Sequence, residues 1–341
     1  MSSLVQAAGI LGLVTTALFL VETIRNKGRN PEKSYFLAGL NTFLIPIRFF
    51  KLSHYRHGGD FVRMEDTMKD AVKETGLTDF GDLSFIDSYK KISELPFYRS
   101  LKFTNVGFIT AAKEGVLTLE RRLKMVDYLK HVPQALKTPL QNPVFVFGLG
   151  RSGTTFVHRL LSLDPEARSP KLWELVLPVP AANAGAPGSA SMQKDIEGRK
   201  KFIIDRVKER NWMGDSALEN LHEVGAELAE ECLFCLSDEI PLSFNYLYTV
   251  LLNLTTAFKQ IPSDRIRAAY AAYRQYLQVL SYQVGQGGQD GQDKTKRWVL
   301  KCPLHVFYLK ELAEVFPDAR IVWAHRHPVP TVSSLCTLLK A

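Results

Sequence analysis

The sequence predicts an α/β protein with a central parallel sheet flanked by helices, preceded by an N-terminal membrane helix. Downstream of residue 142, apolar strand patterns alternate with helical patterns, which is typical of a parallel sheet. At the other end of the chain, an uncharged and mostly apolar run covers residues 2–21. Hydrophobic residues make up 46% and charged residues 23% of the 341 residues, which indicates a folded protein rather than a disordered one.

Residues 1–50 are expected to anchor the protein in a membrane. Residues 2–21 are long enough for a span, which takes about 20 apolar residues. Basic residues follow this run directly, and the positive-inside rule places them in the cytosol. A second apolar run, residues 35–50, is short for a span: if it crosses, the following chain lies in the lumen, and otherwise the chain stays cytosolic. The alternatives for residues 2–21 are a buried helix and a cleaved signal peptide. The signal peptide is disfavoured, because no basic segment precedes the apolar run.

Residues 51–140 predict a helical region without a recognisable chemical motif. Polar and apolar residues are mixed in helical patterns, and Pro96 and Pro133 interrupt them. The residues that carry chemistry are therefore expected in residues 141–341.

A glycine-rich loop follows the first strand of residues 141–341. The apolar run Val144–Phe147 leads into Gly148–Gly153, and Thr154 begins a helical pattern. Such a loop directs backbone N–H groups at one point, and the helix N-terminus adds partial positive charge there. The sequence therefore predicts a binding site for a phosphate-like anion.

Two nucleotide-binding motifs match this loop only in part. Gly148 and Gly153 have the spacing of the P-loop, G-x-x-x-x-G-K-[ST], but Thr154 occupies the position of its lysine. Gly148, Gly150 and Gly153 also match G-x-G-x-x-G, a motif that needs a second strand ending in an acidic residue about 20 positions later. Residues 164–170 contain two prolines and predict a loop instead, so both readings are disfavoured.

Two further predicted strands end in basic residues. The run Arg297–Lys301 predicts a strand, and residues 306–316 predict an amphipathic helix behind it. Residues 319–326 predict another strand with Arg326 at its end, and residues 331–339 predict the next helix. This order provides two cations at strand ends.

Taken together, these motifs resemble those of the sulfotransferase family, whose donor is 3′-phosphoadenosine 5′-phosphosulfate (PAPS). The run Arg151–Thr155 resembles the family's 5′-phosphosulfate loop, and Arg326 with Ser334 resembles its 3′-phosphate pair. Residues 298–305 match W-x-L-K-x-P-x-H, and residues 325–328 match H-R-D-P except that His327 replaces the aspartate. The resemblance covers about residues 142–341 and implies a P-loop-NTPase-like three-layer fold. Residues 51–140 lie outside it and are expected to cover the acceptor side of the sheet.

The resemblance also implies a role for each matching position. Arg151 and Lys301 are expected to stabilise charge during transfer, and no metal is needed because a sulfuryl group carries less charge than a phosphoryl group. The planar guanidinium of Arg326 suits the 3′-phosphate, since its fork matches two phosphate oxygens. The residues expected to bind the donor are Gly150, Arg151, Ser152, Gly153, Thr154, Thr155, Arg326 and Ser334.

An acceptor hydroxyl needs a general base within hydrogen-bond reach, and three residues compete for this role. Glu174 ranks first because it follows the first loop helix, where Golgi-type relatives place a catalytic glutamate, although a helix-end salt bridge is the alternative. His305 ranks second. Cytosolic relatives have a histidine two residues after the strand lysine, but here that position is Pro303 and the histidine comes two residues later. His222 ranks third, on a predicted helix rich in glutamates, where a core-edge or surface histidine is the more common finding.

The expected function is a membrane-anchored sulfotransferase that uses PAPS and acts on an alcohol hydroxyl of a glycan or lipid. A P-loop nucleotide kinase is one alternative, but the lysine and acidic magnesium ligand that it needs are not evident. A membrane-tethered nucleotide-binding protein without turnover is the other. Golgi-type relatives imply a Golgi or ER location, on a side of the membrane that the sequence leaves open.

Two features at the level of the whole chain complete the prediction. The net charge is +8, but no nucleic-acid motif accompanies it, so an anionic donor, acidic acceptor or membrane surface explains the basic balance. The sequence stops at Ala341, shortly after Ser334, whereas the relatives continue. The chain is therefore expected to be a fragment or a truncated member, with donor binding better supported than catalysis.

Overall fold

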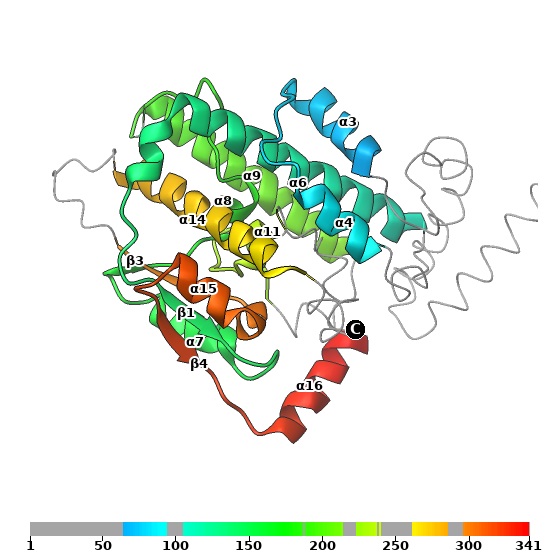
Figure 1. The fold of residues 1–341 in the computed structure, drawn as a ribbon, viewed down its shortest axis with the longest axis vertical. Coiled ribbons are helices and arrows are strands. Elements are labelled where there is room, and N and C mark those ends of the chain that lie inside the picture. Colours follow the sequence, from blue (N-terminus) through cyan, green and yellow to red (C-terminus); the bar gives the residue numbers. More distant parts are fainter. Residues whose placement is uncertain are drawn as a thin grey trace, which may run out of the picture.

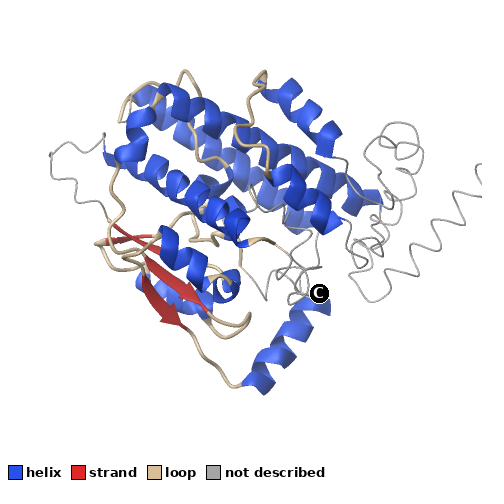
Figure 2. Cartoon of the chain, viewed as in Figure 1, coloured by secondary structure: helices blue, strands red, loops and turns tan. Residues whose placement is uncertain are grey.

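A computed structural model describes residues 64–93, 105–186, 188–213, 223–236, 239, 261–285 and 296–340. A parallel sheet and a layer of helices make up this part of the chain (Figure 1). Figure 2 shows that most of the helices gather on one side of the strands. The predicted membrane segments at residues 2–21 and 35–50 lie outside the described residues, as does His222. No helix in the described ranges is long and apolar enough to cross a membrane.

The sheet of the described residues has four strands in the order β2-β3-β1-β4, and every pairing is parallel. Its strands are β1 (Val144–Phe147), β2 (Ala167–Arg168), β3 (Arg297–Lys301) and β4 (Arg320–Trp323). Val146 pairs with Lys301 on one side and with Val322 on the other. The carboxyl ends of β1, β3 and β4 therefore lie together at one edge, which confirms the predicted parallel sheet.

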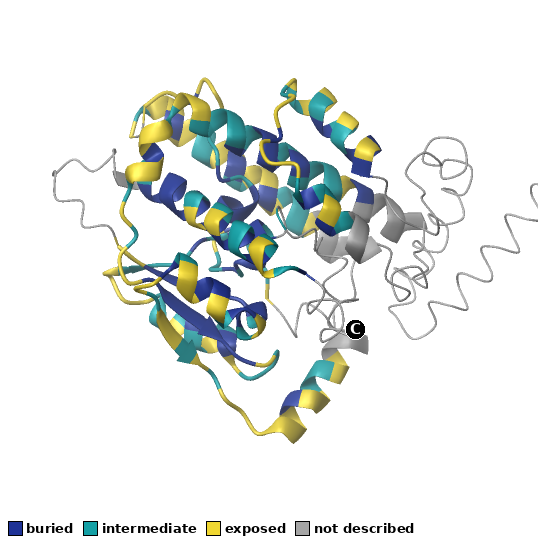
Figure 3. Ribbon diagram, viewed as in Figure 1, coloured by how far each residue is buried: buried dark blue, intermediate teal, exposed yellow. Residues whose placement is uncertain are grey.

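Strand β1 is buried on both faces because a different hydrophobic cluster covers each. Phe145 packs edge-on against Phe316, in the core shared with the large helices. Val144 and Val146 face the other way, towards Val157 of the first loop helix. Strand β4 is an exposed edge strand that ends at Trp323, three residues before the predicted end, and Figure 3 shows its exposure beside the buried central strands.

Four short helical elements follow the strands, and two differ from the prediction. They are α7 (Thr154–Leu161), η3 (Pro303–Phe307), α15 (Leu309–Val315) and α16 (Pro328–Lys340). The helix predicted at residues 306–316 is divided into η3 and α15, because Tyr308 has φ −133° and ψ 33°, outside the helical region. Helix α16 begins three residues earlier than predicted, since proline is well suited to a first helical turn.

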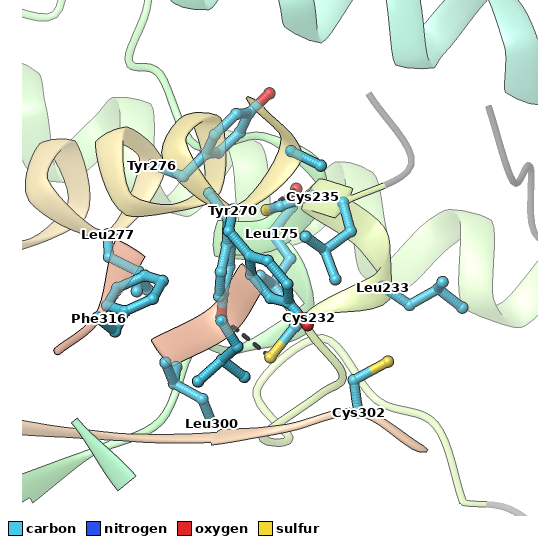
Figure 4. Close-up of a cluster of buried hydrophobic side chains, with 14 of the residues drawn as sticks. Leu175, Cys232, Leu233, Cys235, Tyr270, Tyr276, Leu277, Leu300, Cys302 and Phe316 are labelled. Carbon is cyan, nitrogen blue, oxygen red and sulfur yellow. Dashed lines mark hydrogen bonds between the residues drawn. The ribbon is translucent and has the colours of Figure 1, made fainter. Parts of the chain in front are cut away.

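The remaining described helices form a layer over the sheet (Figure 1). They are α3 (Met64–Thr75), α4 (Phe85–Ser93), α6 (Asn105–His131), η2 (Pro133–Lys137), α8 (Leu172–Val176), α9 (Ala190–Met213), α11 (Leu233–Leu236) and α14 (Ser263–Gly285). Helix α14 supplies one long wall of the main core. Tyr270 and Leu277 lie on one face of it, at helical spacing, and pack near Leu300 of β3 (Figure 4). Tyr273 belongs to the same buried cluster. This packing fixes β3, and with it the position of Lys301.

Candidate active site

The loop between β1 and α7 depends on glycine at two positions. A Cβ atom at Gly148 would clash with the backbone oxygen of Ala324, because β1 and the chain after β4 approach closely there. Gly153 has φ +96°, a conformation that favours glycine, and Arg151 also has a positive φ of 72°. These constraints turn the chain sharply from the strand into the helix.

The N-terminus of α7 presents hydrogen-bond donors to the space beside the loop. Gly153 is the N-cap residue and supplies no side-chain cap, so the first N–H groups of the helix lack that partner. The hydroxyl of Ser152 is buried and has no hydrogen-bond partner among the described residues. Uncapped N–H groups and the helix dipole together attract an anion, so the anion site that the sequence predicts would lie at this helix end.

Lys301 brings a buried positive charge to the same place. Its Nζ donates to Thr155 Oγ1 at 3.3 Å and to Glu231 Oε1 at 2.5 Å, and the residue is 1% exposed. Burial alone lowers the pKa of Lys301, but the carboxylates of Glu231 and Glu230 outweigh it, and the pKa is raised. Lys301 is therefore held as a cation at the carboxyl end of β3, in contact with the loop helix.

Glu230 and Glu231 belong to this site, although the sequence did not indicate it. The sequence predicts a glutamate-rich helix around His222, but the described residues 223–232 form turns that pair with the chain around Pro170 and the end of β3. The Glu230 N–H donates to Pro170 O, and the Cys232 N–H donates to Lys301 O, which brings the glutamates to Lys301. The only sequence signal was a pair of acidic residues directly ahead of the apolar run Cys232–Leu236.

Glu230 is the more deeply buried of the two glutamates. It is 3% exposed, and burial raises its pKa to about 7 although the charge of Lys301 opposes this. The Glu231 side chain is 18% exposed and takes the direct ion pair with Lys301. The two neighbours therefore differ in environment: Glu231 contacts Lys301 and is partly exposed, whereas Glu230 is almost fully buried.

Arg151, Arg326 and Ser334 meet on the other side of the loop. Arg151 Nε donates to Ser334 Oγ at 3.0 Å, and Arg326 Nη1 donates to Arg151 O at 3.2 Å. A Cβ at Gly150 would lie 3.7 Å from Leu335, so α16 runs past the loop. The two halves that the sequence assigned to the 5′ and 3′ ends of a donor are thus adjacent. Arg326 is exposed, which leaves its guanidinium accessible to a ligand.

Glu174 is engaged in local structure. Its Oε1 accepts from Arg168 Nη2 at 2.5 Å, and its Oε2 accepts from the Lys171 N–H at 2.9 Å, where it completes the N-terminal cap of α8. Both oxygens of the buried carboxylate are therefore occupied. This is the helix-end salt bridge that the sequence left open as the alternative to a catalytic role.

His305 lies in the core and not at the surface of the site, which corrects the expectation that it faces an acceptor. It is fully buried, its Nδ1 is 2.8 Å from Tyr270 Oη, and its Nε2 is 3.4 Å from Cys232 Sγ. Its ring packs edge-on against Phe145 with centroids 5.1 Å apart. Burial lowers the pKa of His305 to about 3, so the imidazole stays neutral and structural.

A second buried histidine, in α7, joins that helix to β3. His158 of α7 donates through Nε2 to Val299 O at 3.0 Å, and its Nδ1 has no partner within the described residues. Burial, helped by the charge of Lys301, lowers the pKa of His158 to about 4. The neutral ring ties α7 to β3 without adding charge to the site.

The described residues contain no group of histidine, cysteine, aspartate and glutamate side chains arranged to hold a metal ion. They instead combine loop N–H groups, one buried lysine, two arginines and one accessible glutamate at a single sheet edge. This arrangement suits the binding of a phosphorylated anion and the transfer of a group between oxygens.

Comparisons with known proteins indicate one family for this chain. The model of the sulfotransferase family matches residues 143–341. Sulfotransferase STF1 from Mycobacterium tuberculosis has a similar crystal structure, with a TM-score of 0.61 and 26% identity over 82% of this chain and 72% of that one. Sulfotransferase STF9 from Mycobacterium avium is similar, with the same TM-score and identity over 81% of this chain and 66% of that one. No curated protein sequence matches the chain.

Proposed function

Because this chain belongs to the sulfotransferase family, we propose that it transfers a sulfuryl group from PAPS to an alcohol hydroxyl. The observation that carries the proposal is the convergence at one sheet edge of the loop before α7, Lys301, and the Arg151–Ser334–Arg326 group. Each part suits a different portion of the donor, and the parts come from three separate strand ends.

In the proposed complex, the 5′-phosphosulfate lies against the loop of residues 150–155 and the N-terminus of α7. The N–H groups there and the hydroxyls of Ser152, Thr154 and Thr155 donate to its oxygens. Arg326 and Ser334 bind the 3′-phosphate, which the fork of a guanidinium matches with two parallel hydrogen bonds. A 3′-phosphate is what distinguishes this donor from ATP, so Arg326 sets the choice between them.

The proposed reaction is an in-line displacement at sulfur. The acceptor oxygen forms a bond to sulfur while the bond from sulfur to the 5′-phosphate oxygen breaks, and the acceptor proton passes to a base. The products are a sulfate ester and adenosine 3′,5′-bisphosphate. Lys301 and Arg151 stabilise the negative charge that grows on the leaving phosphate and the transferred group.

For the base we propose Glu231 in place of Glu174 and His305. Glu231 is the carboxylate that contacts the charged Lys301, and part of its side chain is exposed. Both oxygens of Glu174 are occupied, and both ring nitrogens of His305 have partners in the core. When Lys301 turns to the donor oxygens, Glu231 loses its partner and gains basicity, which couples donor binding to acceptor activation.

We further propose that the acceptor is a glycan or lipid alcohol and that residues 2–21 hold the enzyme at a Golgi or ER membrane. The support is the uncharged apolar run in the sequence. Extraction of cell membranes with alkaline carbonate tests the anchor. The full chain should remain in the pellet, whereas deletion of residues 2–21 should release it, and release of the full chain would refute the anchor.

Incubation of the full chain with PAPS and a panel of glycans, sterols and other lipid alcohols tests the activity. Mass spectrometry should detect an acceptor that has gained one sulfuryl group, together with an equal amount of adenosine 3′,5′-bisphosphate. The Lys301→Met variant should lose at least about 100-fold in rate, the scale for removal of one charge-stabilising group. PAPS binding without a sulfated product from any acceptor would favour a binding protein, and phosphate transfer from ATP would favour a kinase.

A further inference from the structure

The described residues line a cavity of about 800 Å³ within the helical layer. Its walls come from α6, α9, the end of α8 and the segment of residues 177–185. No residue of the loop before α7 lines it, and neither do Lys301, Arg326 or Ser334. It is therefore separate from the candidate active site. Its volume lies within the range of small-molecule sites, about 300–1,000 Å³.

One wall of this cavity is aliphatic. The run from Val176 to Ala182 contributes valine, leucine, proline and alanine side chains, and Leu117 of α6 and Met192 of α9 also line the cavity. Such a surface favours an apolar ligand body, because burial of each CH₂ group from water stabilises binding by about 0.8 kcal/mol. It offers few partners to a sugar or to a nucleotide base.

Arg199 of α9 provides a buried charge beside this aliphatic wall. The residue is 8% exposed, its Nε donates to Asp195 Oδ2 at 2.7 Å, and its Nη1 donates to Leu177 O at 2.9 Å. Its Nη2 is buried without a hydrogen-bond partner among the described residues. The guanidinium also stacks on the ring of Trp173, 5.0 Å from the centroid. A desolvated guanidinium nitrogen without an acceptor is costly, so a ligand oxygen that reaches it gains a strong hydrogen bond.

Two other basic residues of the lining are already engaged, which leaves Arg199, among the described residues, as the basic group with an unused buried donor. Lys124 Nζ pairs with Glu120 Oε2 at 3.1 Å, and Arg121 donates to Leu175 O and Phe234 O. Both oxygens of Asp195 are already used, one by Arg199 and the other by the Ala181 N–H at 3.0 Å. We propose that this cavity binds an amphipathic monocarboxylate, with its aliphatic chain against residues 176–182 and its carboxylate at Arg199.

Titration of the full chain with decanoate, followed through tryptophan fluorescence and calorimetry, tests this site. Binding should change the emission of Trp173, which the Arg199 guanidinium covers. The Arg199→Met variant should bind decanoate about tenfold or more weakly, the scale of one charge-assisted hydrogen bond, and Arg199→Lys should recover part of the loss. Lys201→Met is the matched control, because it removes an exposed charge from the same helix outside the cavity, and it should bind normally.

Two further arms keep the test decisive if Arg199 variants fold poorly. Ala182→Trp places a large ring on the aliphatic wall and should abolish decanoate binding while the fold persists. Decanol should bind far more weakly than decanoate, and saturating adenosine 3′,5′-bisphosphate should not displace decanoate. The absence of decanoate binding, equal binding of decanol, or displacement by the nucleotide would each overturn the proposal.

Discussion

At the scale of single residues, the site depends on how one buried lysine is paired. Lys301 is 1% exposed and contacts Thr155 and Glu231, so its charge is maintained by protein carboxylates until a donor arrives. Removal of one partner of a buried pair leaves the other charge uncompensated, and such changes are strongly destabilising. The variants that separate catalysis from stability must therefore keep the shape of each carboxylate.

Glu231→Gln should lower the catalytic rate, whereas Glu174→Gln should lower the stability of the fold. If Glu231 accepts the acceptor proton, Glu231→Gln should lower kcat by about 100-fold or more, the scale of general base catalysis, with little change in donor affinity. Glu174→Gln should instead lower the free energy of unfolding by about 1–3 kcal/mol, because Arg168 loses a buried charged partner. Steady-state kinetics and urea unfolding of both variants distinguish the roles. A large kcat loss in Glu174→Gln alone would return the base to Glu174.

Glu230→Gln should change how stability depends on pH. Burial raises the folded pKa of Glu230 from 4.5 to about 7, so the folded state binds the proton more tightly than the unfolded state. Its contribution to stability is complete below about pH 4.5 and is lost as the pH rises to about 7. The glutamine variant should lack this decline. Between pH 4.5 and pH 7 its free energy of unfolding should therefore fall less than that of the unmodified chain. Urea unfolding at several pH values measures this, and an unchanged slope would contradict the assigned environment.

At the scale of elements, the sequence indicated β1, β3, β4 and α7 because local patterns decide them. Continuous apolar runs predict buried parallel strands, and the glycine-rich turn before Thr154 marks the helix start. The position of His305 was not predictable in this way. It depends on Tyr270 and Cys232, 35 and 73 residues away, and no local pattern reports such contacts. Glu231 was missed for the same reason, since pairing with the ends of other segments overrides the helical pattern there.

Gly148→Ala should damage the loop between β1 and α7, and Gly198→Ala provides the matched control. The added methyl at residue 148 meets the backbone oxygen of Ala324, which no side-chain movement relieves, so we expect a loss of about 1–3 kcal/mol or more. At residue 198, within α9, nothing lies within 4 Å, and the change should stabilise the helix by about 0.5–1 kcal/mol. Thermal unfolding measures both, and equal effects would contradict the close approach of β1 and β4.

At the scale of the whole molecule, two neutral histidines hold the sheet to its helices. His158 joins α7 to β3, and His305 joins η3 to α14 and β1. The elements that carry the cations of the site are thus held together by two imidazoles that remain uncharged at neutral pH. The family match covers the sheet and its loops. The cavity in the helical layer extends beyond the matched residues 143–341, because α6 forms one of its walls.

Acid should therefore unfold the protein cooperatively through these histidines. Their folded pKa values, about 4 for His158 and about 3 for His305, lie below the ordinary value of 6.5. Their contribution to stability is complete above about pH 6.5 and is lost as the pH falls through these lower values. His305→Gln should show a shallower loss of stability between pH 6.5 and pH 3 than the unmodified chain. His131→Gln, an exposed control, should leave the slope unchanged.

Calorimetric titration of the full chain with adenosine 3′,5′-bisphosphate, beside ATP and the Arg326→Ala variant, tests the proposed donor site. We expect micromolar binding of the bisphosphate, much weaker binding of ATP, and a collapse of bisphosphate binding in the variant, because the proposed site places the 3′-phosphate at Arg326. The absence of bisphosphate binding, a preference for ATP, or full affinity in Arg326→Ala would contradict the donor site described at this sheet edge.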